Sequence, residues 1–398
     1  MEGYDVYQDI SERTEGCIYI GVVGPVRTGK STFIKRFMDL LVLPNMDNEF
    51  KRERTRDELP QSANGKTIMT TEPKFVPNEP IELTLRENAK FKVRLVDCVG
   101  YLVEGAMGHM EDNSPRMVNT PWFEDRIPFE EAAEIGTRKV IADHSTIGLV
   151  VTTDGSITDL PRRSYIEAEE RVIKELKELD KPFIVALNSA RPKAQETIEL
   201  REALETKYNT PVMIIDALKM EMDDLEGILG KILFEFPARE INFHIPRWMD
   251  TLELDHWLKQ GIVDSIRTNL REVNRIRDID DAIRKFDGAE NLQAVEISDM
   301  RLGEGVVNIT ISLEDGLFYR VLGEVSGYSL EGDYQLVALV KELAQSKREY
   351  DKVKSALGDV KEFGYGMVAP SVEEIKLEEP VIVKQGSKFG VRLRASAP

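Results

Sequence analysis

The sequence has few cysteines, no long apolar run and a deficit of basic charge, and each shortage excludes a class of protein. Its two cysteines, Cys17 and Cys98, provide neither a disulfide framework nor the paired spacing of a zinc site. Both lie in or beside apolar segments, so we expect buried free thiols in a reducing compartment. No apolar stretch approaches the ~18 residues that span a bilayer, and the N-terminus lacks the basic and apolar regions of a signal peptide. We therefore predict a cytoplasmic protein, with peripheral membrane attachment left open.

Acidic side chains outnumber basic ones by 71 to 53, which gives a net charge of -18 spread along 398 residues. Such a surface argues against nonspecific binding to nucleic acid or to anionic membranes, although it does not exclude a local basic patch. The apolar content of 41% is that of an ordinary soluble protein, and the length predicts two or three domains.

The strongest motif is Gly24-Pro25-Val26-Arg27-Thr28-Gly29-Lys30-Ser31, which fits the phosphate-binding pattern G-x-x-x-x-G-K-[ST]. Residues 18–23 predict a buried strand before it, and residues 31–38 predict the start of a helix after it. In this setting backbone N–H groups surround phosphates, Lys30 supplies a cation and Ser31 offers a hydroxyl to Mg²⁺. The alternative, a chance Gly-Lys-Ser in a helix-opening turn, is disfavoured by the flanking strand and helix.

Asp97 and Gly100 form a second motif, Asp-x-x-Gly, at the end of a strand pattern over residues 92–100. An acid there holds Mg²⁺ directly or through water, and Gly100 presents its backbone N–H to the terminal phosphate. Between the two motifs, where related nucleotide hydrolases carry a switch loop, Thr70 and Thr71 are candidates to sense Mg²⁺ and the terminal phosphate. The alternative is that they are ordinary threonines at a strand edge.

Strand and helix patterns alternate over residues 1–240, which predicts an α/β fold of the P-loop type: a mostly parallel sheet with helices on both faces. Ligand then binds at the carboxyl ends of the strands. Apart from the elements that flank the phosphate loop, strands are expected at 74–76, 81–85, 92–100, 147–153, 182–188 and 211–215. Helices are expected at 4–13, 129–143, 164–179, 194–208 and 223–234. Residues 101–126 show no period and are expected to form a long loop.

Residues 241–398 are expected to form a separate α+β middle domain without a phosphate loop, helical over 247–287 and mixed over 288–398. The helical part is expected mainly over 252–286, with a break near Asp278. Strands are expected at 292–297, 306–312, 318–326, 381–384 and 389–394, and a helix at 334–357. We expect this region to serve interactions.

The strand that ends at Asn188 is where GTPases carry Asn-Lys-x-Asp, whose aspartate pairs with guanine. Here the residues are Asn188-Ser189-Ala190-Arg191, so serine replaces the lysine and arginine replaces the aspartate. A guanidinium group cannot accept hydrogen bonds from the N–H donors of guanine. The scaffold is GTPase-like, but ATP is the better candidate for its nucleotide.

Taken together, the phosphate loop, Thr70 and Thr71, the Asp97 motif and residues 188–191 make the sequence similar to the stage IV sporulation protein A family over essentially its whole length. Its most specific stretches include 57–77, 96–101, 115–117, 119–122 and 131–141. The family is assigned to the translation-factor-related GTPase class but uses ATP. The resemblance therefore implies hydrolysis of ATP to ADP and phosphate that drives self-assembly into a static polymer, the basement layer of the spore coat on the forespore surface.

The resemblance also implies partners: other copies of the chain, other coat proteins and a small amphipathic membrane-bound peptide, on the mother-cell side of the forespore outer membrane. Family members continue past the position of Pro398 into a C-terminal domain linked to localisation and to that peptide. We therefore expect this chain to lack that domain, through which the family reaches the membrane peripherally. No nucleic acid partner is expected.

The candidate site residues follow from the motifs, and the resemblance implies the same roles for Lys30, Asp97, Thr70 and Thr71. These four are the candidate catalytic residues, and the candidate Mg²⁺ ligands are Ser31, Asp97 and Thr71. Candidates for binding ATP are Gly24, Arg27, Thr28, Gly29, Lys30, Ser31, Thr32, Gly100 and Asn188.

Transition-state charge has two candidate stabilisers, Arg27 or an arginine from a neighbouring subunit. No residue is evident that positions the attacking water, so we expect slow turnover. The alternatives are a regulatory GTPase-like switch, a structural nucleotide-binding protein without turnover and, more weakly, a kinase.

Overall fold

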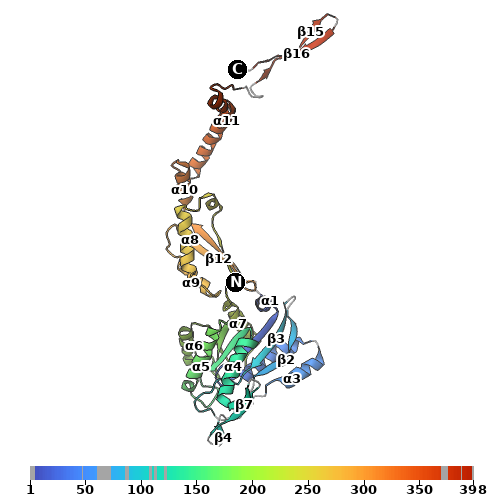
Figure 1. The fold of residues 1–398 in the computed structure, drawn as a ribbon, viewed down its shortest axis with the longest axis vertical. Helices are drawn as coiled ribbons and strands as arrows, with labels where there is room; N and C mark the ends of the chain where they lie inside the picture. The colour runs from blue at the N-terminus through green and yellow to red at the C-terminus, as the bar shows by residue number, and fades with distance from the viewer. Residues whose placement is uncertain are drawn as a thin grey trace. The chain divides into compact units, whose positions relative to one another are not determined.

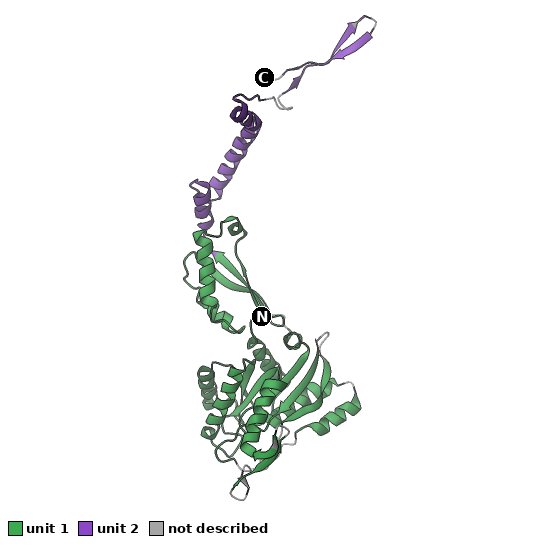
Figure 2. Ribbon diagram, in the orientation of Figure 1, with its two compact units in different colours: residues 1–312 green, residues 313–398 purple. Residues whose placement is uncertain are grey.

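The computed structural model describes residues 5–46, 48–60, 73–85, 89–106, 110–111, 114–120, 123–368, 375–386 and 388–396. Among these residues, no helix is both long and apolar enough to cross a membrane. The chain divides into two compact units, residues 1–312 and 313–398 (Figure 2). The expected boundary at residue 240 stays a prediction.

A sheet in the order β10-β9-β8-β1-β3-β2 forms the centre of the first unit (Figure 1). β2 pairs with β3 in antiparallel orientation, and every other neighbouring pair is parallel. The expectation of a mostly parallel sheet is confirmed. The strands are β1 (Cys17–Val23), β2 (Lys74–Leu85), β3 (Ala89–Asp97), β8 (Ile147–Thr153), β9 (Phe183–Asn188) and β10 (Val212–Ile215).

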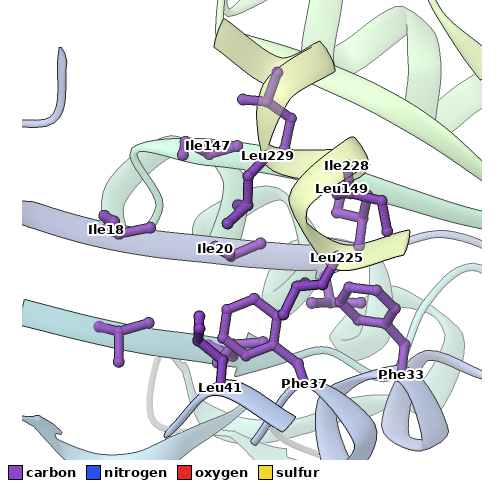
Figure 3. Close-up of a cluster of buried hydrophobic side chains, with 14 of the residues drawn as sticks. Ile18, Ile20, Phe33, Phe37, Leu41, Ile147, Leu149, Leu225, Ile228 and Leu229 are labelled. Carbon is purple, nitrogen blue, oxygen red and sulfur yellow. The ribbon is translucent and has the colours of Figure 1, made fainter. Parts of the chain in front are cut away.

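Two hydrophobic cores cover the two faces of this sheet, because successive strand residues point to opposite sides. Leu149 of β8 packs in one core and Val150 in the other. Figure 3 shows the first core, where Phe33 and Phe37 of α2 cluster with Leu225 of α7. The first core takes side chains from α1 (Val6–Arg13), α2 (Lys30–Phe37) and α7 (Met222–Phe234), and the second from α4 (Phe129–His144), α5 (Ile166–Glu178) and α6 (Gln195–Tyr208).

After α2 the chain continues through a π-helical turn over Met38–Val42 and a 3-10 turn over Leu43–Asn45. These are followed by α3 (Glu49–Glu58), a charged helix with little buried surface. A further 3-10 turn over Arg162–Tyr165 leads into α5.

The expectation of a long loop over residues 101–126 is wrong in part, because two antiparallel hairpins lie there. β4 (Met110–Glu111) pairs with β5 (Ser114–Pro115), and β6 (Met117–Thr120) pairs with β7 (Phe123–Pro128). In β6, Val118 is buried and Met117 is exposed. This alternation is only four residues long, which is too short to stand out as a strand pattern.

The rest of the first unit contains a sheet in the order β11-β13-β12. Its elements are β11 (Glu240–His244), a 3-10 turn over Arg247–Thr251, α8 (Trp257–Leu270), α9 (Asp278–Arg284), β12 (Leu292–Arg301) and β13 (Val306–Leu313). The helix expected over 252–286 is interrupted earlier than predicted, between Leu270 and Asp278. Arg275 and Arg277 in this interruption form ion pairs with the buried Glu235, at 2.5 Å and 3.1 Å. These ion pairs join the region to the end of α7.

The second unit contains two helices and short strand pairs among its described residues: α10 (Leu317–Ser326), α11 (Asp333–Phe363), β14 (Lys376–Leu377), β15 (Val381–Gln385), β16 (Lys388–Arg392) and β17 (Ala395–Ser396). The predicted strand over 318–326 is wrong, because this segment is the helix α10. Its buried residues, Leu317 and Val321, are four apart and share one helical face. That period outweighs the β-forming preference of its aromatic and β-branched residues.

Candidate nucleotide site

The phosphate loop joins the end of β1 to the start of α2, as the motif requires. Gly29 directly precedes the helix with φ of 94°. A Cβ atom there would lie 2.3 Å from Nδ2 of Asn188, so glycine is needed for this close approach. Arg27 also has a left-handed backbone, with φ of 64°. The helix N-terminus behind the loop directs backbone N–H groups toward an anion.

Lys30 is buried, and its Nζ donates hydrogen bonds to the carbonyl oxygens of Gly24 at 3.3 Å and Pro25 at 2.6 Å. Burial lowers the pKa of the Lys30 ammonium, against the opposing effects of Cys98 and Asp97. Both hydrogen-bond acceptors are neutral carbonyls. An anionic phosphate oxygen would be a stronger acceptor for this ammonium than either of them.

Asp97 lies at the end of β3, and its Oδ2 accepts a hydrogen bond from Ser31 Oγ at 2.7 Å. Its Oδ1 is buried and has no hydrogen-bond partner among the described residues. Burial raises the pKa of the Asp97 carboxyl, although the bond from Ser31 and the charge of Lys30 act in the opposite direction. A carboxylate with an unpaired oxygen beside a hydroxyl is the hard oxygen donor set that Mg²⁺ binds. Asp97 and Ser31 therefore fit the predicted metal site.

Gly100 connects the two motifs. Its φ is 89°, and a Cβ atom there would lie 2.2 Å from the Gly24 carbonyl oxygen and 2.6 Å from Lys30 Nζ. The next residue, Tyr101, accepts a backbone hydrogen bond from Val26 N at 2.9 Å. The phosphate loop and the segment after Asp97 are therefore in direct contact, and only glycine leaves room for Lys30 between them.

The side chain of Tyr101 is buried, and its hydroxyl donates to Glu175. Burial and this hydrogen bond raise the pKa of Tyr101. The residue directly after Gly100 is thus engaged with α5 and does not supply a group that positions water. The expectation of slow turnover stays a prediction.

Asn188 lies at the end of β9, and its side chain is buried. Its Nδ2 donates to the Thr28 carbonyl oxygen at 3.0 Å, and its Oδ1 accepts from Ala217 N at 3.1 Å. The side chain therefore joins the phosphate loop to the segment after β10. Its amide is occupied by the protein backbone, and its assigned part in binding ATP stays a prediction.

The sequence motifs did not identify Asp154, which lies just after β8 beside Ser189. Its carboxylate accepts hydrogen bonds from Ser189 Oγ at 2.6 Å, Thr197 Oγ1 at 3.1 Å, Ser156 N at 2.8 Å and Ser156 Oγ at 2.5 Å. Burial alone would raise its pKa, but these hydrogen bonds hold the pKa of Asp154 below its usual value. With its lone pairs occupied, this carboxylate does not replace the missing guanine-binding aspartate. Its position at a strand end was the only sequence signal for it.

The remaining candidates lie around the same loop. Thr28 is buried, with its hydroxyl donating to the Pro25 carbonyl oxygen at 3.0 Å, and Thr32 is half-buried in the first turn of α2. The half-buried guanidinium of Arg27 has no hydrogen bond or ion pair among the described residues. Thr70 and Thr71 lie outside the described residues. Their assigned roles, like those of the other candidates, stay predictions.

The cysteines take no part in this site. Cys98 is buried, and its thiol donates to the Val22 carbonyl oxygen at 3.1 Å. Burial raises the pKa of this thiol to about 11, so it stays protonated and unreactive at neutral pH. Cys17 is free and half-buried.

Several known proteins are similar to this chain. The stage IV sporulation protein A of Clostridioides difficile (strain 630) is 54% identical over 394 residues, which cover 99% of this chain and 80% of that protein. The protein of the same name from Bacillus subtilis (strain 168) is 50% identical over 398 residues, which cover 100% of this chain and 81% of that protein. Among solved structures, an SsGBP variant aligns with 56% of each chain at 18% identity with a TM-score of 0.30, which is too low to support an argument.

Two family descriptions cover the chain from end to end. Residues 1–237 match "Stage IV sporulation protein A, ATPase domain", and residues 238–398 match "Stage IV sporulation protein A, middle domain". The first match contains the phosphate loop, Asp97, Gly100 and Asn188. The chain therefore belongs to the stage IV sporulation protein A family, and its first 237 residues are that family's ATPase domain.

Proposed function

We propose that this chain hydrolyses ATP to ADP and phosphate with Mg²⁺, and that turnover drives its self-assembly into the static basement layer of a spore coat. The observation that carries the chemistry is the half-buried Asp97, with Oδ2 bonded to Ser31 and the buried Oδ1 unpaired among the described residues. Membership of the family supports the assembly part, including a cytoplasmic site of action on the mother-cell side of the forespore outer membrane and contacts with coat proteins and a membrane-bound peptide.

Each residue has a distinct task in this proposal. The N–H groups of the phosphate loop bind the phosphates, and Lys30 exchanges its carbonyl acceptors for phosphate oxygens. Asp97 and Ser31 hold Mg²⁺, which supplies charge neutralisation at the phosphates. Arg27, whose guanidinium has no partner among the described residues, is the candidate in this chain to stabilise the charge that develops in the transition state. Thr70 or Thr71 senses the terminal phosphate.

ATP is favoured over GTP because the described residues that follow β9, where a GTPase reads guanine, offer no free carboxylate. Arg191 replaces the aspartate, and the hydrogen-bond capacity of the nearby Asp154 is taken up by Ser156, Ser189 and Thr197. The rival function, a regulatory GTPase switch, requires such an acceptor.

The test is phosphate release with Mg²⁺ and either ATP or GTP, with sedimentation of the same samples. Wild-type protein is compared with Lys30→Ala and Asp97→Asn, and Lys35→Ala, an exposed lysine of the same helix, is the matched control. We expect ATP-selective release that falls at least roughly a hundredfold in the two site variants and persists in the control, with pelletable protein only after turnover. Equal use of GTP would support the switch instead, and tight binding without release would indicate a structural nucleotide.

A further inference from the structure

The long helix α11 has an apolar stripe that the described residues leave exposed. Of its 31 residues only Ala356 is buried. Leu343, Tyr350, Leu357 and Val360 are between 44% and 49% exposed. A helix of this length with so little buried surface gains little stability from its own chain, because helices in water are stabilised mainly by packing of an apolar face.

The stripe follows a heptad repeat, the spacing of a coiled coil. Taking Leu336 as position a, four successive heptads run to Phe363, about 42 Å of helix. Apolar residues occupy every a and d position except one, which is Ser346. The a positions are Leu336, Leu343, Tyr350 and Leu357, and the d positions are Leu339, Ser346, Val353 and Val360. Helices with this period supercoil so that the a and d side chains interlock with those of a partner helix.

The charges beside the stripe specify the partner. The g positions Glu342 and Glu349 are acidic, and the e positions Lys347, Lys354 and Lys361 are basic. In a parallel pair of identical helices, each g residue faces the e residue five positions later on the other helix. Glu342 then meets Lys347 and Glu349 meets Lys354 of a second copy. An antiparallel pair would instead place lysine against lysine and glutamate against glutamate.

We infer that α11 is a self-association surface, through which copies of this chain form a parallel, in-register coiled coil. Lys347 and Glu349 already pair within the helix, with Asp351 at 2.7 Å and Lys352 at 3.2 Å. These pairs are exposed and contribute little to stability, so they do not oppose the contacts between helices. The inference deepens the self-assembly in the proposed function and rests on it only for its biological purpose.

The first test is the oligomeric state of the full chain without nucleotide, measured by sedimentation over a wide range of protein concentration. Lys347→Glu with Lys354→Glu makes both flanks acidic, and Glu342→Lys with Glu349→Lys makes both basic. We expect each double variant alone to associate roughly tenfold to a hundredfold more weakly, and an equimolar mixture of the two to associate as tightly as wild type. The matched control, Lys341→Glu with Arg348→Glu, makes the same charge change on the outer face and leaves association unchanged.

A second test reports orientation. Leu343→Cys, in a Cys17→Ser background, is expected to form a disulfide between copies under mild oxidation. In an antiparallel pair the two Cys residues would lie about 15 Å apart and could not bond. Three results would overturn the inference. These are a monomeric wild type, an equimolar mixture that fails to associate, and a control variant that weakens association as much as Lys347→Glu with Lys354→Glu does. Because nucleotide is absent, these results do not depend on whether the chain hydrolyses ATP.

Discussion

At the scale of single residues, we expect Asp97 to couple stability to the proposed Mg²⁺ site. Its pKa is raised by burial, so the folded protein binds this proton more tightly than the unfolded chain does. The ionised carboxylate therefore destabilises the fold. This loss of stability is absent below the ordinary pKa of aspartate and grows as pH rises through the raised pKa of the folded protein. Without Mg²⁺ we expect Asp97→Asn to unfold roughly 2–4 °C higher than wild type at neutral pH, with the two converging below about pH 4.

MgADP should reverse that order, because only the wild type has the carboxylate that we propose as a ligand of the metal. Thermal unfolding with and without MgADP measures both effects. A lower melting temperature for Asp97→Asn without metal would mean that the carboxylate serves mainly as a structural acceptor for Ser31.

Gly100 makes a second prediction at this scale, and Gly16 provides the matched control. Both have positive φ, 89° and 76°, so alanine costs each about 1–2 kcal/mol of the free energy of unfolding. A Cβ at Gly100 would overlap the Gly24 carbonyl and Lys30 Nζ, whereas one at Gly16 would meet nothing within 4 Å. Gly100→Ala should therefore weaken ATP binding at least roughly tenfold and Gly16→Ala should not. Calorimetric titration with ATP checks this, and equal affinities would remove Gly100 from the site.

At the scale of elements, the sequence predicts best those segments whose burial repeats over many residues. The strand at Ile147–Thr153 was predicted with its bounds, because all seven residues are buried and apolar or hydroxylated. The helix α10 was predicted as a strand, since Leu317 and Val321 alone mark its buried face. The hairpin at β6 and β7 was missed because its alternation is brief. Within the site, Asp154 had no motif, since two of its four hydrogen bonds come from Ser189 and Thr197, which are distant in sequence.

The segment after β9 should set the choice of base. Arg191 is exposed, so changing it alters stability by no more than about 0.5 kcal/mol. Arg191→Asp supplies an acceptor for the N–H groups of guanine, and we expect the ratio of kcat/KM for ATP to that for GTP to fall by at least roughly tenfold. Arg191→Ala, which removes the cation without adding an acceptor, should change the ratio little. If the two variants shift it equally, the carboxylate is not what distinguishes the bases.

At the scale of the whole molecule, the two units should respond to different ligands. The phosphate loop and Asp97 lie in the first unit, so MgADP at a hundred times its Kd should add about 2.7 kcal/mol to that unit's stability and raise its melting temperature by roughly 4 °C. The described part of the second unit has almost no core of its own, so the loss of α11 helicity should instead depend on protein concentration. Circular dichroism melts at several protein concentrations, with and without MgADP, separate the two responses. A single transition that shifts equally with protein concentration and with MgADP would show that the units unfold together. The variant with Lys347→Glu and Lys354→Glu should lose the concentration dependence and keep the shift caused by MgADP.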